Sequence, residues 1–254
     1  MAASAERIPF AAIVLAAGQG KRMQSDLPKV LHPLRGKPLV NWVIEAARGA
    51  GAERVVAVLG YGREQVEKIL PAGAETALQL EQKGTGHAAR CAEERLGGYA
   101  GPVVVLSGDV PLIRAATIRE LVARQRASGA AAVVLSAQVG GEHAYGRIVR
   151  DGAGAFKRIV EHKDATPDER KIGEINTGTY AFGPGRLFEA LKHLKDDNAQ
   201  GEFYLTDTVG WFARRGEGVE AIVAPRVEEC LGINTPQELA AAERACAALS
   251  GKEG

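Results

Sequence analysis

The first residues in the chain whose types and spacing could do chemistry form a glycine-containing basic turn, LAAGQGKRM, at positions 15–23. Glycines let backbone N–H groups approach a phosphate closely, and Lys21 and Arg22 add positive charge beside them. Two familiar phosphate motifs do not match. A Walker loop needs a Lys followed by Ser or Thr, and a dinucleotide-binding turn needs a third glycine where Met23 stands. The turn predicts phosphate binding of another kind.

Positive charge is concentrated around this turn. From Gly18 to Pro38 the chain has five Lys or Arg and one Asp, although its formal net charge as a whole is only +1. A small polyanionic ligand would explain the concentration, and a solvated basic loop is the alternative. The near-neutral total gives no reason to expect a nucleic acid or a membrane surface as a partner.

Asp109 is a second candidate because it closely follows the apolar run Val103–Ser107. The carboxyl ends of strands face the ligand in open α/β sheets, and a carboxylate placed there suits Mg²⁺. A turn or helix-capping role is the alternative for such a residue.

These residues need a scaffold, and the apolar pattern predicts one. Four runs read as strands without polar alternation, as in a parallel sheet covered on both faces: 11–17, 55–59, 103–107 and 131–137. Helical spacing separates them, carried by Leu39, Val43 and Ala46/Ala47, by Val66, Ile69 and Leu70, and by Ile118, Leu121 and Val122. The order of strand and helix predicts a Rossmann-like α/β fold with a doubly wound, mostly parallel sheet.

The pattern changes after about Gly140. Residues 146–150 and 156–161 flank Asp151-Gly152-Ala153-Gly154, which predicts a hairpin. A further strand is expected over 174–182, and helices over 185–194, 204–214 and 236–249. This half is predicted to be an antiparallel excursion from the sheet. No repeat or linker divides the 254 residues, so we expect a single domain, with a core over about 8–234 and a C-terminal helix and tail over about 235–254.

Composition limits the classes of protein. The longest apolar run, 10–17, is far shorter than the roughly 20 residues that a membrane-spanning helix needs. The N-terminus lacks the apolar segment of a secretory signal. Three widely spaced cysteines favour neither a disulfide framework nor a zinc site. Free cysteines are typical of a reducing compartment, so a cytoplasmic location is expected.

Longer motifs go beyond these general features. The run LAAGxGxRM is followed by LPKVL at 27–31, and this combination resembles the nucleotide-diphosphate-sugar pyrophosphorylase family. Eight segments occur in the family's order: 25–32, 82–88, 108–112, 145–148, 159–165, 174–178, 198–207 and 232–234. More narrowly, they are similar to the uridylyltransferase domain of bacterial bifunctional N-acetylglucosamine-1-phosphate uridylyltransferase/glucosamine-1-phosphate acetyltransferases.

The resemblance implies a role for each matching residue. Arg22 and Lys29 would contact the phosphates as catalytic residues. The nucleotide would be bound by Ala16, Ala17, Gly18, Gln79, Gly84 and Thr85, with Thr85 also able to cap the helix that follows. The sugar would be bound by Gly146, Glu161, Asn176 and Thr177. Asp109 and Asn234 would hold Mg²⁺. His32, His87 and His162 are assigned no chemistry.

The implied reaction forms UDP-N-acetylglucosamine and pyrophosphate from UTP and N-acetylglucosamine 1-phosphate, which would supply cell-envelope precursors. Two alternatives stay open: a related enzyme for another sugar phosphate or nucleotide, and a non-catalytic regulator that binds nucleotide sugars. The family's left-handed β-helix repeats are not found in this chain. Acetyl transfer is therefore not expected, and trimer formation loses its usual basis.

Overall fold

The computed structural model describes residues 8–141 and 143–250. At its centre lies a nine-stranded sheet in the order β11-β7-β10-β6-β1-β4-β5, with the pair β8–β9 branching from β10. The strands are β1 (Phe10–Ala16), β4 (Ala52–Leu59), β5 (Glu75–Leu78), β6 (Val103–Ser107), β7 (Ala132–Gln138), β8 (Arg147–Arg150), β9 (Phe156–Val160), β10 (Glu174–Phe182) and β11 (Val219–Val223). A small hairpin, β2 (Pro33–Leu34) with β3 (Lys37–Pro38), lies outside this sheet.

The predicted mostly parallel sheet is confirmed. Along the main path every neighbouring pair is parallel except the two pairs that β10 forms with β6 and β7. The register aligns the strand ends, since Ala16 lies beside Leu59, Leu59 beside Leu78, and Leu15 beside Ser107. The loops that follow β1, β4, β5 and β6 therefore meet at one edge of the sheet, where ligands of such folds bind.

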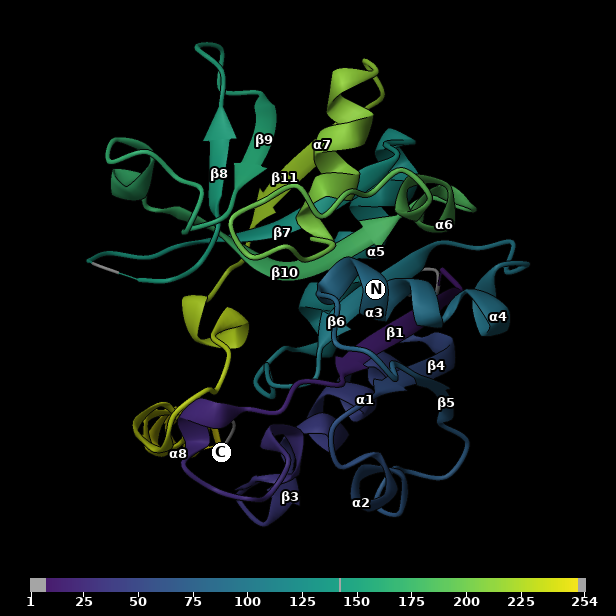
Figure 1. Cartoon of the computed structure of the whole chain (residues 1–254), viewed down its shortest axis with the longest axis vertical. Helices are drawn as coiled ribbons and strands as arrows, with labels where there is room; N and C mark the ends of the chain where they lie inside the picture. Colours follow the sequence, from purple (N-terminus) through teal and green to yellow (C-terminus); the bar gives the residue numbers. More distant parts are fainter. Residues whose placement is uncertain (1–7, 142, 251–254) are drawn as a thin grey trace, which may run out of the picture.

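The reversed direction of β10 brings a second group of residues to the same edge. Phe182, at its C-terminal end, pairs with Val103 at the start of β6 and with Ala132 at the start of β7. Its first residues consequently lie near the carboxyl ends of those two strands. The hairpin β8–β9 continues from this point and stands away from the parallel half of the sheet (Figure 1).

Helices cover both faces of the sheet, as the doubly wound prediction requires. The helices are α1 (Leu39–Ala50), α2 (Arg63–Glu67), α3 (Thr85–Cys91), α4 (Glu93–Leu96), α5 (Ala115–Ser128), α6 (Arg186–Leu191), α7 (Thr206–Arg214) and α8 (Pro236–Ser250). Short 3-10 turns are η1 (Lys21–Met23), η2 (Lys29–Leu31), η3 (Glu169–Lys171) and η4 (Val227–Cys230). One apolar cluster joins α1 and α5 to the sheet, and another joins α3, α6 and α7 to its opposite face.

Alternate residues of β1 serve these two clusters. Ala12 and Val14 belong to the first, and Ala11 and Ile13 belong to the second. All four are fully buried. Burial of an aliphatic side chain such as Ile13 stabilises the fold by about 1.5–3 kcal/mol, so both faces of this central strand must be apolar. This explains the absence of polar alternation in the sequence.

The C-terminal helix α8, at the lower left of Figure 1, packs beside β2. A third, smaller cluster connects them through Met23, Leu34, Leu39, Ile233 and Ala242. This contact matters for the site because Met23 ends the basic turn and Ile233 precedes Asn234. None of the helices in the described part of the chain combines the length and the hydropathy that a membrane span requires.

The clearest differences from the sequence prediction concern α2 and two strands of the sheet. Helix α2 ends at Glu67, so Ile69 and Leu70 lie beyond it and not inside a helix. Pro71 follows them, and a residue that precedes proline disfavours the helical region. The strands β5 and β11 were not predicted. Both are edge strands, and apart from Ala77 in β5 their residues are partly buried or exposed, so neither has the buried apolar run of a central strand.

Candidate functional site

The basic turn after β1 is held in place from both ends. Ala17 is buried at its start, and Met23 is buried at its end. Gly20 has a left-handed backbone with φ of +72°, and a methyl group there would lie 2.4 Å from the Lys29 Cβ atom. A glycine is therefore needed at position 20 for two reasons: its conformation and its contact with Lys29. Gly18 has open space around it.

Arg22 and Lys29 lie in different surroundings. Arg22 is exposed on η1, and its positive charge acts on Tyr145. Lys29 is mostly covered and points into the site, where its Nζ atom donates to Asp109 Oδ2 at 2.5 Å and to Asn234 Oδ1 at 3.0 Å. Residues separated by 80 and 205 positions in the sequence thus meet at one ammonium group.

Backbone contacts hold the two oxygen donors together. The Ile233 N–H donates to the Asp109 carbonyl oxygen at 2.9 Å. The Asn234 Nδ2 atom donates to the Gly232 carbonyl oxygen at 3.3 Å, which leaves Oδ1 directed at Lys29. Gly232 lies close to both side chains, since a methyl group on it would stand 3.2 Å from Asp109 Oδ2 and 3.5 Å from Asn234 Nδ2.

This pair fits a hard divalent cation. A carboxylate oxygen and an amide oxygen already converge on one positive group, and oxygen donors of these kinds are the ligands that Mg²⁺ accepts. Among the described residues no three His, Cys, Asp or Glu side chains form a metal cluster. Two protein ligands agree with the usual Mg²⁺ site, in which waters and substrate phosphates complete the coordination.

A cavity of about 330 Å³ opens beside Lys29 and Asp109. Its lining includes most of the predicted nucleotide-binding residues, namely Ala17, Gly18, Gln79, Gly84 and Thr85. The sequence had given no role to several further lining residues: Leu15, Val30, Ala88, Ser107 and Glu202. Ala16 is the exception among the predicted residues, because it is buried in the core at the end of β1 and does not line the cavity.

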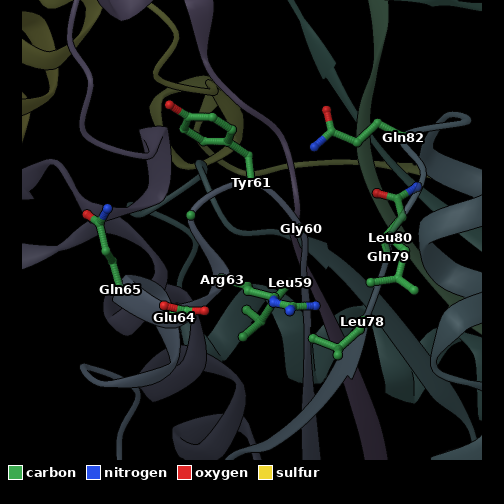
Figure 2. A pocket seen from close by; sticks show the side chains of 11 residues that line it. Leu59, Gly60, Tyr61, Arg63, Glu64, Gln65, Leu78, Gln79, Leu80 and Gln82 are labelled. Carbon is green, nitrogen blue, oxygen red and sulfur yellow. The ribbon is translucent and has the colours of Figure 1, made fainter.

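Gln79 and Gln82 form a wall between this cavity and a second hollow of about 420 Å³. Figure 2 shows the second hollow, between the loop that contains Tyr61 and the segment that contains Leu78 and Leu80. The Gln82 Nε2 atom donates to the Ala17 carbonyl oxygen at 3.0 Å, and the Tyr61 N–H donates to the same oxygen at 3.1 Å. The start of the basic turn is thereby tied to both segments.

The turn Gly84-Thr85-Gly86 packs directly against the Phe203 backbone. A methyl group would lie 2.7 Å from the Phe203 carbonyl oxygen at Gly84 and 2.9 Å from it at Gly86. The predicted capping role of Thr85 is wrong, since Thr85 is the first residue of α3 and caps nothing. Its hydroxyl instead accepts a hydrogen bond from the Leu205 N–H at 3.0 Å, which joins the start of α3 to the start of α7.

The predicted sugar-binding residues gather around the hairpin β8–β9 and the start of β10. Gly146 lies against Glu161, because a methyl group on Gly146 would lie 3.2 and 3.3 Å from the two carboxylate oxygens. The Asn176 N–H donates to the Gly146 carbonyl oxygen at 2.9 Å, and the Asn176 Nδ2 atom donates to the Tyr180 hydroxyl at 2.8 Å. Gly146 thus lies against both Glu161 and Asn176.

Thr177 is built into the sheet. Its hydroxyl donates to the Leu135 carbonyl oxygen at 2.7 Å and accepts from the Thr179 N–H at 3.3 Å. It lies at an irregularity where the β10–β7 register shifts between Asn176 and Thr179. Gly178 takes a φ of +77° there and comes within reach of Ser107, a residue that lines the cavity of about 330 Å³ beside Lys29. The irregularity therefore links the two groups of residues.

Glu161 has an unfavourable electrostatic environment. Burial raises the pKa of its carboxyl, and the negative charges of Asp207 and Asp164 raise it further, while a hydrogen bond from the Thr206 hydroxyl acts in the opposite direction. Burial likewise raises the pKa of Asp207. A carboxylate held in this way is ready to accept hydrogen bonds from ligand hydroxyl groups.

Sequence reasoning missed two residues that connect the parts of this site. The Tyr145 hydroxyl accepts a hydrogen bond from the Gly232 N–H at 3.2 Å, which links the segment before Gly146 to the segment of Asn234. Tyr180 is fully buried and supports the Asn176 amide. Tyr145 lies in one of the motif segments, 145–148, and Tyr180 lies just after another, 174–178. The spacing of residues along the sequence does not show which group a side chain will bond to.

The sequence is similar to those of known proteins. The sequence pattern described as the MobA-like NTP transferase domain matches residues 12–209. The bifunctional protein GlmU of Pelobacter propionicus is 49% identical over 236 residues, which are 92% of this chain and 51% of that protein. The bifunctional protein GlmU of Shouchella clausii is 46% identical over 234 residues, with 92% and 52% covered. The chain thus spans about half the length of the curated relatives that it matches.

A solved structure has a similar fold. The crystal structure of a UDP-glucose pyrophosphorylase complexed with UDP-glucose superposes with a TM-score of 0.74 over 94% of this chain and 98% of its own. The two sequences are 20% identical. This likeness confirms the Rossmann-like α/β architecture.

Proposed function

This chain belongs to the MobA-like NTP transferase family, and from that premise we propose that it forms UDP-N-acetylglucosamine and pyrophosphate from UTP and N-acetylglucosamine 1-phosphate. The motif resemblance to bifunctional uridylyltransferases is confirmed by identities of 46–49% to proteins of that type. The proposal concerns nucleotidyl transfer alone, because the chain matches only about half of each relative.

One arrangement supports this activity most strongly. Lys29 reaches Asp109 and Asn234 at the rim of a cavity whose walls contain Gln79 and Gly84. A positive side chain, a pair of oxygen donors and a cavity of about 330 Å³ thus lie side by side. These are the groups that a nucleoside triphosphate and its cation require.

The chemistry needs little from acid–base catalysis. An oxygen of the sugar 1-phosphate attacks the α-phosphorus of UTP, and pyrophosphate leaves on the opposite side. The attacking oxygen is already ionised, so no general base is required, and catalysis depends on alignment and charge neutralisation. Lys29, inside the site, and Arg22, on the exposed turn, are suited to neutralise the phosphates.

A divalent metal is the expected cofactor of such a transferase, and we propose Mg²⁺ held by Asp109 and Asn234. When bound, it would neutralise phosphate oxygens and help to orient them. Ala17, Gly18, Gln79, Gly84 and Thr85 would contact the nucleoside, because all of them line the cavity.

The sugar would bind on the β8–β10 side. Glu161 would accept hydrogen bonds from the hydroxyl groups of the sugar. The Asn176 amide, which donates one hydrogen bond to Tyr180, would form its further hydrogen bonds with the sugar. Gly146 would leave room for the N-acetyl group. The hydroxyl of Thr177 already has two partners, so its contribution would come through the backbone at the β10 irregularity.

The test is a pyrophosphate-release assay with the full chain and Mg²⁺. UTP with N-acetylglucosamine 1-phosphate is compared with glucose 1-phosphate, glucosamine 1-phosphate and the other three nucleotides. Fast release confined to the first pair supports the proposal. Release with another pair alone replaces the proposed substrates, and binding of UTP without any release identifies a regulator in place of an enzyme.

A further inference from the structure

The Gln79 side chain has a fixed orientation. Its Nε2 atom lies 3.0 Å from the Gly84 carbonyl oxygen and 3.1 Å from His87 Nδ1. A carbonyl oxygen only accepts hydrogen bonds, so the nitrogen of the amide, and not its oxygen, must face Gly84. Figure 2 shows the amide with its nitrogen on the side of the neighbouring helix and its oxygen turned away. Rotating it by half a turn would set two oxygens against each other.

Both N–H groups of Gln79 are consequently occupied. An amide nitrogen has two hydrogens, of which Gly84 takes one and His87 takes the other. No described residue donates to the remaining group, Gln79 Oε1. Since Gln79 lines the nucleotide cavity, its side chain offers a ligand an acceptor and no donor.

His87 can take this hydrogen only while its ring is neutral. Nδ1 must carry a lone pair, so the ring proton must sit on Nε2. Burial lowers the pKa of His87, and the positive charges of Arg90 and Lys83 lower it further, against the opposing influence of Glu81. The ring therefore stays an acceptor at neutral pH.

We propose that His87 is a positioning residue that sets base selectivity: by occupying the second N–H of Gln79, it leaves only an acceptor for the base. This inference rests on the proposed function for the contact between the base and Gln79. Uracil has a hydrogen at N3 and can donate to that oxygen. Cytosine has a lone pair at N3, which would face the Gln79 oxygen, a second acceptor. To bind this lone pair, Gln79 would have to donate the N–H that already bonds to His87.

The test compares the binding of UDP and CDP to the full chain by isothermal titration calorimetry. We expect the wild-type protein to prefer UDP. In His87→Leu the second N–H of Gln79 is released and can serve cytosine, so the preference should fall by about tenfold or more, the effect of one hydrogen bond. In His87→Asn the side-chain oxygen replaces Nδ1 as acceptor, and the preference should be kept.

The outcomes separate this role from a structural one. A structural role would weaken UDP and CDP binding by the same factor in His87→Leu, and that result overturns the proposal, as does a wild-type protein without any preference for UDP. If the Leu variant does not fold, the preference for UDP over CDP is compared between His87→Asn, which should keep it, and His87→Ala, which should lose it. If the wild-type protein prefers UDP but releases no pyrophosphate, the proposed function fails while the role of His87 is retained.

Discussion

Lys29 Nζ lies 2.5 Å from Asp109 Oδ2, and the same ammonium group lies 3.0 Å from Asn234 Oδ1. The positive charge of Lys29 therefore stands at the point where the two proposed metal ligands converge. A divalent cation bound by those oxygens and the lysine ammonium would compete for one position. Binding of the cation would then turn Lys29 away from the carboxylate and free it for the phosphates.

The first prediction concerns Lys29→Met. Turnover should fall by roughly two to three orders of magnitude, about 3–4 kcal/mol, because a positive group is lost from the developing charge on the phosphates. In the absence of nucleotide, Mn²⁺ should bind more tightly to this variant, since no ammonium competes for Asp109. Electron paramagnetic resonance of Mn²⁺ measures this directly. Lys29→Arg keeps the charge and is the control, and weaker Mn²⁺ binding in Lys29→Met would contradict the competition.

The second prediction concerns Asp109→Asn. This variant keeps the size of the side chain and removes its charge, while the backbone hydrogen bond from Ile233 is unaffected. The concentration of Mg²⁺ that gives half-maximal turnover should rise by about tenfold or more, because an amide is a weaker ligand than a carboxylate. A Mg²⁺ titration of pyrophosphate release measures the change. An unchanged Mg²⁺ requirement in a folded variant would remove Asp109 from the metal site.

The fold could be predicted where burial determines residue type. The strand β6 was predicted with its observed ends, because its apolar residues are covered on both faces. The strands β5 and β11 were missed because edge strands bury less of their surface and lack such a run. The pattern of apolar residues predicts a strand only where the strand itself is apolar. It therefore carries little information about edge strands.

The sequence predicted which segments form the candidate site. It did not predict which side chains in those segments contact one another. The motifs named Lys29, Asp109 and Asn234. The parallel register of β1 and β6 explains why the segments of Lys29 and Asp109 meet, and the hydrogen bond from the Ile233 N–H to the Asp109 carbonyl oxygen brings Asn234 beside them. The position of Thr85 before a predicted helix suggested a capping role that it does not have, and the motifs gave His87 no role. The direction of a hydroxyl or an amide depends on partners from other elements, such as Leu205 for Thr85, and no local pattern contains them.

The third prediction concerns Gly146→Ala. The added methyl group would lie 3.2–3.3 Å from the Glu161 carboxylate oxygens and from Ile159, so the carboxylate must shift. The KM for the sugar phosphate should rise by about tenfold, consistent with overpacking effects of 1–3 kcal/mol, with little change in the KM for UTP. Gly152→Ala is the matched control, because Gly152 lies in the β8–β9 turn with nothing within 4 Å. Equal effects of the two substitutions would refute a specific contact at Gly146.

The fourth prediction concerns the stability of Glu161→Gln. Burial raises the pKa of Glu161 from its ordinary value of 4.5, so the folded protein binds this proton more tightly than the unfolded chain does. The contribution to stability is therefore greatest below pH 4.5 and is lost as the pH rises through the raised pKa. At pH 7.5 the buried charge destabilises the fold, and Glu161→Gln removes it.

We expect Glu161→Gln to be more stable than the wild-type protein at pH 7.5 by about 0.5–2 kcal/mol, the usual range for a stabilising substitution. The difference should shrink as the pH falls towards 4.5. Urea unfolding at several pH values measures it, with Glu120→Gln, an exposed position on α5, as the control. The same variant should bind the sugar phosphate more weakly, because a neutral amide accepts hydrogen bonds less strongly than a carboxylate. A gain in stability together with a loss of binding identifies Glu161 as a residue kept for its ligand, whereas a variant less stable at pH 7.5 would show that its charge supports the fold.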